Sequence, residues 1–87
     1  MSKYKQVKVD YRIFKNGYLF SNGIALNKTA FEIWECCREP VDENIIVKKF
    51  FEKYTPQSDE DKKMIIEDIK NCLNLLIEGN LIERIDK

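Results

Sequence analysis

The sequence contains no histidine. Histidine is the commonest general base and the commonest imidazole ligand of metals, so its absence weighs against triad-type catalysis and most catalytic metal sites. Three cysteines are present, at positions 36, 37 and 72, and this spacing matches neither a disulfide framework nor a four-ligand zinc site. No motif for phosphate binding or nucleophilic catalysis occurs. We therefore expect a protein that is not an enzyme and has no cofactor.

Net charge is also lacking, because 15 basic residues balance 15 acidic residues. A balanced chain has no broad electrostatic attraction for nucleic acid or anionic lipid. No apolar run approaches the roughly 20 residues of a membrane helix, and the polar N-terminus, MSKYKQVKVDYR, has no signal-peptide core. We expect a cytoplasmic protein with reduced thiols, and neither nucleic acid nor membrane among its partners.

The first third of the chain has the pattern of a small antiparallel sheet. Apolar and charged residues alternate over residues 7–13, as in a half-buried strand. Asn16-Gly17 and Asn22-Gly23 follow, and Asn-Gly between apolar residues is the strongest short hairpin signal. A single domain of 87 residues can bury about 60–68% of its unfolded surface, enough for one core.

Two-residue loops in both hairpins would place Phe14 opposite Leu19 and Leu19 opposite Leu26. This register divides the sheet residues between two faces. One face would carry Phe14, Leu19, Ile24 and Leu26, and the other would carry Ile13, Tyr18, Phe20 and Ala25. Both sets are partly apolar, so alternation alone leaves open which face belongs to the core. A bulged three-residue loop would exchange the faces.

Three helices are expected after the strands. Asn27, Asp42 and Ser58 are good N-cap residues. Pro40 would stop the first helix, Pro56 lies just beyond the second, and the third would run to about residue 78 with Gly79 at C′. Residues 81–85, LIERI, would form a short terminal strand or an extended tail. The predicted fold is α+β, with an N-terminal three-stranded antiparallel sheet followed by three helices and a possible wing.

Several motifs in this order resemble the PqqD-like family, whose domains are also called RiPP recognition elements. The family pattern has a strand ending in Leu-Asn, a small residue opening a helix, an aliphatic-Trp pair, a Val-acidic-acidic helix start and a closing Gly-x-Leu-aliphatic. The matching residues here are Leu26-Asn27, Ala30, Ile33-Trp34, Val41-Asp42-Glu43, Gly79 and Leu81-Ile82. The match covers about residues 11–85. Asn44 and the consecutive pair Cys36-Cys37 depart from the family pattern and leave the subfamily open.

The resemblance implies a small, winged-helix-like, non-catalytic domain that binds the leader segment of a ribosomally made precursor peptide. Such a domain presents the peptide to a modifying enzyme, often a radical SAM enzyme. The leader would add as a strand beside the third strand of the sheet and pack against the third helix.

The third strand has features that favour strand addition without the resemblance. Ile24, Ala25 and Leu26 contain no charge and no proline, whereas natural sheet edges are usually blocked. An open apolar edge can accept a peptide strand through backbone hydrogen bonds. The alternative is that the N-terminal segment or the LIERI tail covers this edge.

The third helix carries a second feature. Seven apolar residues form one broad stripe that we expect to be core: Ile65, Ile66, Ile69, Cys72, Leu73, Leu76 and Ile77. Met64 and Leu75 fall outside the stripe, about 16 Å apart along the helix, which is close to the length of a five-residue extended peptide. The predicted peptide-binding residues are Ile24, Ala25, Leu26, Asp61, Met64, Asp68, Asn71, Cys72 and Leu75. The alternative is that Met64 and Leu75 are ordinary exposed residues.

Other constellations have plainer interpretations. Cys37 and Trp34 are expected in the core, and Cys36 is incidental. A basic cluster near the second and third helices is the only argument for DNA binding: Lys48, Lys49, Lys53, Lys62 and Lys63. Neighbouring acidic residues largely neutralise it. The alternative functions are thus a small winged-helix DNA-binding regulator, or a subunit whose groove binds only a partner protein.

Overall fold

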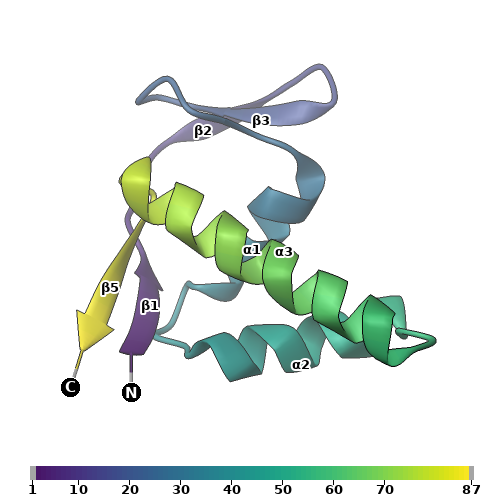
Figure 1. Ribbon diagram of the computed structural model, residues 1–87. Helices are drawn as coiled ribbons and strands as arrows, with labels where there is room; N and C mark the ends of the chain where they lie inside the picture. Colours follow the sequence, from purple (N-terminus) through teal and green to yellow (C-terminus); the bar gives the residue numbers. More distant parts are fainter. Residues whose placement is uncertain (1, 87) are drawn as a thin grey trace.

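The computed structural model describes residues 2–86 and has three helices and two antiparallel sheets (Figure 1). The elements in chain order are β1 (Ser2–Gln6), β2 (Tyr11–Phe14), β3 (Gly17–Phe20), β4 (Ala25–Leu26), α1 (Lys28–Cys36), α2 (Glu43–Tyr54), α3 (Asp59–Glu78) and β5 (Ile82–Asp86). The predicted α+β class, with an antiparallel sheet before three helices, is confirmed.

The two termini form a sheet of their own. β1 pairs antiparallel with β5, with Tyr4 opposite Arg84 and Gln6 opposite Ile82. Tyr4 also exchanges backbone hydrogen bonds with Val41, at 2.7 and 3.0 Å. Of the two alternatives expected for residues 81–85, a short terminal strand or an extended tail, the structure shows the strand. The single strand expected over residues 7–13 is wrong, because the chain leaves β1 at Gln6 and enters β2 only at Tyr11.

The first hairpin is shifted by two residues from the predicted register. Its loop is Lys15 and Asn16, with Phe14 opposite Gly17 and Lys15 at a φ of +57°. Gly17 is therefore the first residue of β3 and not a turn residue. A Cβ at Gly17 would lie 2.9 Å from the backbone oxygen of Leu26, so close approach of two backbones explains the glycine.

The second hairpin has the bulged three-residue loop. Phe20 donates its N–H to the Ile24 carbonyl at 2.8 Å, and Gly23 has a φ of +91°, as expected for a loop of this length. Leu26 lies opposite Tyr18 and Ala25 opposite Leu19. The faces of β4 are therefore exchanged relative to the two-residue prediction, because Ile24 and Leu26 share the face of Phe20.

All three predicted N-caps are confirmed. The side chains of Asn27, Asp42 and Ser58 accept backbone N–H groups at 2.8, 3.0 and 3.2 Å. Gly79 is not the C′ residue of α3: its φ is −82°, and the left-handed residue is Asn80, at +58°. A Schellman pattern closes the helix, since Asn80 donates to Ile77 and Leu81 donates to Leu76.

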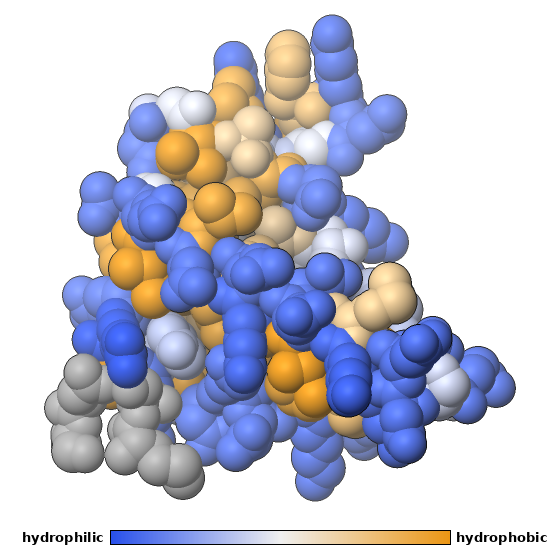
Figure 2. Space-filling view, viewed as in Figure 1, coloured by the Kyte–Doolittle hydropathy of each residue, from blue (hydrophilic) through white to orange (hydrophobic). Residues whose placement is uncertain are grey.

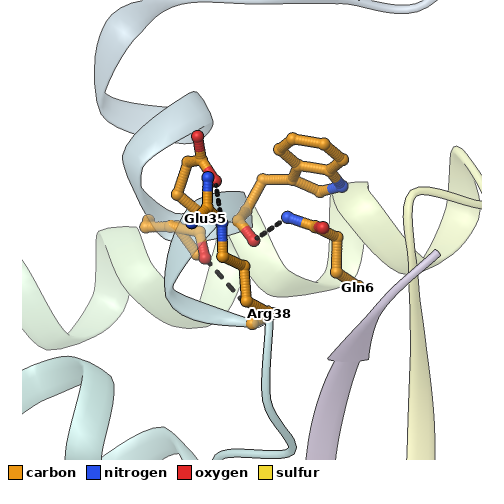
Figure 3. A network of polar contacts seen from close by, with 6 residues as sticks. Gln6, Glu35 and Arg38 are labelled. Carbon is orange, nitrogen blue, oxygen red and sulfur yellow. Dashed lines mark hydrogen bonds and ion pairs between the residues drawn. The ribbon is translucent and has the colours of Figure 1, made fainter. Parts of the chain in front are cut away.

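Helix α1 ends at Cys36, short of the predicted stop at Pro40. Figure 3 shows the polar contacts at this end. The side chain of Gln6 donates to the Trp34 carbonyl at 3.1 Å, and Arg38 pairs with Glu35 at 2.9 Å. The backbone N–H of Gln6 also bonds to the Cys37 carbonyl at 2.7 Å. These contacts with the segment that carries β1 take up carbonyls that a longer helix would have used.

The core lies between the three helices and the three-stranded sheet, and α2 contributes Ile46 and Phe50 to it. Ile69, Leu73 and Leu76 of α3 are each only 1% exposed, so the centre of the predicted stripe is confirmed. Trp34 is buried as expected, and its indole N–H donates to the Leu81 carbonyl at 2.8 Å. The hydrogen bond from Trp34 ties α1 to the turn between α3 and β5. Cys37 is fully buried.

Candidate functional site

The candidate site is the outer edge of β4. The sheet order is β2-β3-β4, which leaves β4 at an edge among residues 2–86. β1 and β5 pair with each other and not with β4. The alternative that either terminal segment covers this edge is therefore wrong for the described residues.

The backbone of Ala25 faces this outer edge. In an antiparallel ladder, residues that bond to the neighbouring strand alternate with residues whose N–H and C=O point away from it. The carbonyl of Ile24 points toward β3, because it accepts the N–H of Phe20. The N–H and C=O of Ala25 consequently point outward. The side chain of Ala25 is small, and the residue is exposed, so the backbone groups can be reached by an incoming strand.

The β3–β4 loop fixes β4 to the C-terminal end of α3. The side chain of Asn22 donates to the Gly79 carbonyl at 2.9 Å. A Cβ at Gly79 would lie 3.5 Å from the side chain of Ile24. Ile24 and Leu26 are half-buried and pack against the core. Their side chains therefore anchor the edge, and the groups available to a ligand are those of Ala25.

One face of α3 runs along the helix on the same side as Gly79. Successive residues turn by 100°, so Leu75, Cys72 and Asp68 lie within about 40° of Gly79 around the helix axis. Leu75 is 66% exposed, whereas Cys72 is half-buried. Three of the predicted peptide-binding residues of α3 thus lie on the helix face that reaches β4 at its C-terminal end. Asn71 is exposed on the margin of this face.

Apolar surface gathers in the same region. Figure 2, viewed from the same side as Figure 1, shows apolar atoms over the C-terminal half of α3 and the neighbouring sheet. Met64 is 62% exposed, so both residues placed outside the core stripe are at the surface. This exposure agrees with a groove wall and also with ordinary surface residues.

The remaining predicted residues of α3, Asp61 and Met64, lie toward its other end. They line a cavity of about 330 Å³ together with Asp68 and the segment from Tyr54 to Gln57. Asp61 also caps the helix start, because its carboxylate accepts the N–H of Gln57 at 3.1 Å. The predicted set is therefore divided between a β4 end and an α2–α3 end.

Tyr54 and Pro56 complete this second cavity and were absent from the prediction. Both follow from the way in which α2 ends. Thr55, the C-cap residue, has a φ of +45°, which turns the chain so that its neighbours lie beside α3. Only the Pro56 stop signal was visible in the sequence, and it carries no information on the direction of the turn.

Burial disfavours the thiolate form of all three cysteines. Burial raises the pKa of Cys37 to about 12 and that of Cys72 to about 11. Burial also raises the pKa of Cys36, an effect that the nearby Lys49 partly offsets. Since the thiolate is the nucleophile, these cysteines are poorly suited to redox or covalent chemistry.

This environment predicts the order of alkylation. With iodoacetamide at about pH 8, we expect Cys36 to react first and the buried Cys37 to react most slowly, because few Cys37 thiols ionise. Mass spectrometry of digested samples would measure each rate, with the urea-unfolded chain as the control, where the three rates should converge. Labelling of Cys37 as fast as Cys36 in the native protein would contradict the buried environment.

The basic cluster is exposed and partly paired. All five lysines of the cluster are at the surface. Lys53 pairs with Glu32, which also accepts the hydroxyl of Tyr54 at 3.0 Å. Part of the positive charge is thus neutralised by a residue of α1 that the sequence had not associated with it.

None of the helices within residues 2–86 is long and apolar enough to cross a membrane.

Comparison with known proteins adds no relative. No family model matches the chain, and no match was found among curated proteins or solved structures.

Proposed function

We propose that this chain is a non-catalytic binding module for the leader segment of a ribosomally synthesised precursor peptide. The leader adds as a strand to β4, and the module delivers it to a modifying enzyme, such as a radical SAM enzyme, in the cytoplasm. The proposal keeps the resemblance to the PqqD-like family. The observation that carries it is the outer edge of β4, which is unpaired within residues 2–86 and is anchored to α3 beside the helix face that carries the exposed Leu75.

The geometry supports strand addition in two ways. Ala25 offers one N–H and one C=O at the edge, which is the minimum for antiparallel or parallel pairing. The α3 face provides a side wall where alternate side chains of the peptide can pack. Binding at this edge uses only the surface of the module. By holding the precursor there, the module raises the effective concentration of precursor at its enzyme without chemistry of its own.

The experiment uses defined peptides. Synthetic, fluorescein-labelled N-terminal segments of the short peptides encoded beside the gene are titrated with the purified chain, and anisotropy reports binding. The proposal requires one leader to bind and the chain alone to leave it unmodified. The absence of binding by every such leader, or turnover of precursor by the chain alone, would contradict it.

Salt separates this proposal from the DNA-binding regulator. DNA affinity falls steeply with salt because bound counterions are released. Strand addition at an uncharged edge depends on backbone hydrogen bonds and apolar contact, and we expect it to weaken little. Anisotropy titrations of the leader and of a random DNA duplex, each at low and high salt, would distinguish the two functions.

Truncation of the α3 wall gives a further prediction. Met64→Ala and Leu75→Ala should leave the free energy of unfolding within about 0.5 kcal/mol of the parent, because both side chains are largely exposed. If they contact the leader, affinity should fall about tenfold to a hundredfold, since burying such side chains is worth roughly 1.5–3 kcal/mol. Urea unfolding and leader titration of each variant measure the two quantities.

The two readouts separate the outcomes. A large loss of stability would mean that these residues belong to the core. Unchanged stability together with unchanged binding would remove the α3 wall from the site and leave only the β4 edge. Glu78→Ala, at an exposed position near the end of the same helix, is the matched surface control.

A further inference from the structure

β2 forms the second edge of the three-stranded sheet. In the sheet order β2-β3-β4, β2 has a neighbouring strand on one side only within residues 2–86. Its apolar residues are unusually exposed: Tyr11 is 43%, Phe14 51% and Ile13 73% exposed. Natural edge strands of this kind are usually blocked or paired. This edge lies at the opposite side of the sheet from β4.

The backbone alternation shows which groups of β2 are available. The carbonyl of Asp10 points toward β3, because it accepts the N–H of Ser21 at 2.8 Å. Residues one step further along the strand point the other way. The N–H and C=O of Tyr11, and again those of Ile13, therefore face outward from the sheet.

The side chains beside Tyr11 have opposite charges. Asp10 and Arg12 flank Tyr11 on one face of the strand, and both are exposed. Among the described residues, neither side chain takes part in an ion pair or a hydrogen bond. A strand with one acidic and one basic residue around a central outward-facing residue is complementary to itself in antiparallel orientation.

We propose that β2 and the residues just before it form a self-association surface, on which the same segment of a second copy of this chain adds antiparallel, with Tyr11 opposite Tyr11. The pairing then spans residues 8–14, of which residues 11–14 form β2 and Asp10 is held beside β3 by its bond to Ser21. In this register Asp10 lies opposite Arg12 of the second copy, and Arg12 opposite its Asp10. Both are pairs without mutual backbone bonds, in which side chains approach most closely. A two-fold axis at Arg12 would instead oppose two arginines, and an axis at Ile13 would oppose Arg12 to Phe14.

The apolar side chains fit the same register. Ile13 of each copy lies opposite Val9 of the other and diagonal to Tyr11. A cavity of about 410 Å³ adjoins Tyr11 on this face and is bordered by Lys8 and Trp34. Ile13 of the second copy would enter that cavity, which would cover the most exposed apolar side chain of the hairpin.

The assembly joins two three-stranded sheets into one and leaves both β4 edges at its ends. The β4 edge therefore remains open in the dimer, and the dimer is independent of whether β4 binds a peptide. Opposite charges at the centre also limit association to a closed two-fold pair, because other registers place like charges or an unpaired arginine at the contact.

Charge exchange tests this surface. Sedimentation equilibrium of the full chain measures the monomer–dimer equilibrium for the parent, for Arg12→Asp and for the double variant Asp10→Arg with Arg12→Asp. We expect a dimer for the parent. Arg12→Asp should raise the dissociation constant about tenfold or more, because like charges then face each other twice. The double variant should restore dimerisation.

Circular dichroism and urea unfolding confirm that each variant is folded, and Lys48→Asp, an exposed reversal on α2, controls for net charge. A parent that is monomeric at all concentrations would overturn the proposal and leave the β2 edge to another kind of partner. A dimer that Arg12→Asp leaves unchanged, or that the double exchange fails to restore, would also overturn it.

Discussion

Replacing Ala25 by proline is expected to abolish or severely weaken leader binding while the protein remains folded. The N–H of Ala25 points away from β3, so its loss removes a donor from the ligand and not from the β3–β4 ladder. One backbone hydrogen bond is worth about 1 kcal/mol. The proline ring also occupies the space of the approaching strand. We therefore expect affinity to fall about tenfold or more.

Ala25→Val is the matched control, because valine keeps the N–H and suits a strand. Proline at Leu26 is a second comparison: the Leu26 N–H faces Tyr18, so this variant should lose stability as well as binding. Ile24→Pro removes an N–H that bonds to the Asn22 side chain at 3.2 Å. If all three proline variants stay folded and bind the leader normally, the peptide site lies elsewhere.

Leu76→Ala is expected to destabilise the protein by about 2–5 kcal/mol. Leu76 is 1% exposed at the centre of the α3 stripe, and truncation there leaves a cavity that the surrounding core fills only in part. Ile69→Ala, at an equally buried position, should behave alike. For a domain of this size the melting midpoint should fall by about 10 °C or more.

The adjacent residue provides the control for this measurement. Leu75→Ala removes the same atoms from the same helix, but Leu75 is 66% exposed, so the free energy of unfolding should change by about 0.5 kcal/mol or less. Urea unfolding of both variants gives the difference. Equal losses at the two positions would mean that the rotation of α3 about its axis is wrong.

Local signals in the sequence predicted the helices well. Asn27, Asp42 and Ser58 cap the helices that their positions indicated, because a cap depends only on residues within one turn. The helical period also separated buried Leu76 from exposed Leu75. These features need no knowledge of distant parts of the chain.

The sheet could not be predicted in the same way. Asn16-Gly17 has the sequence of a turn, yet Gly17 is needed where β3 passes close to the Leu26 carbonyl. The alternation over residues 7–13 suggested one strand, yet the N–H of Val7 bonds to the Leu81 carbonyl at 2.9 Å and the chain then departs from β1. Both outcomes depend on partners outside the turn or strand itself, which periodicity does not identify.

The candidate site was predictable in part for the same reason. The edge position of β4 and the exposure of Met64 and Leu75 followed from strand order and helix period. The hydrogen bond between Asn22 and Gly79, which sets α3 beside the edge, joins residues 57 positions apart in the sequence. The capping role of Asp61 likewise depended on the turn between α2 and α3.

Amide hydrogen exchange at Ala25 is the most direct test of strand addition. Its N–H points outward and should exchange rapidly in the free protein, since open edges offer no acceptor. Exchange is followed by NMR before and after saturation with the leader that binds in the anisotropy assay, with the inward-facing N–H of Leu26 as the internal control. We predict strong protection of Ala25 on binding. Leader binding that leaves the exchange of Ala25 unchanged would contradict the account.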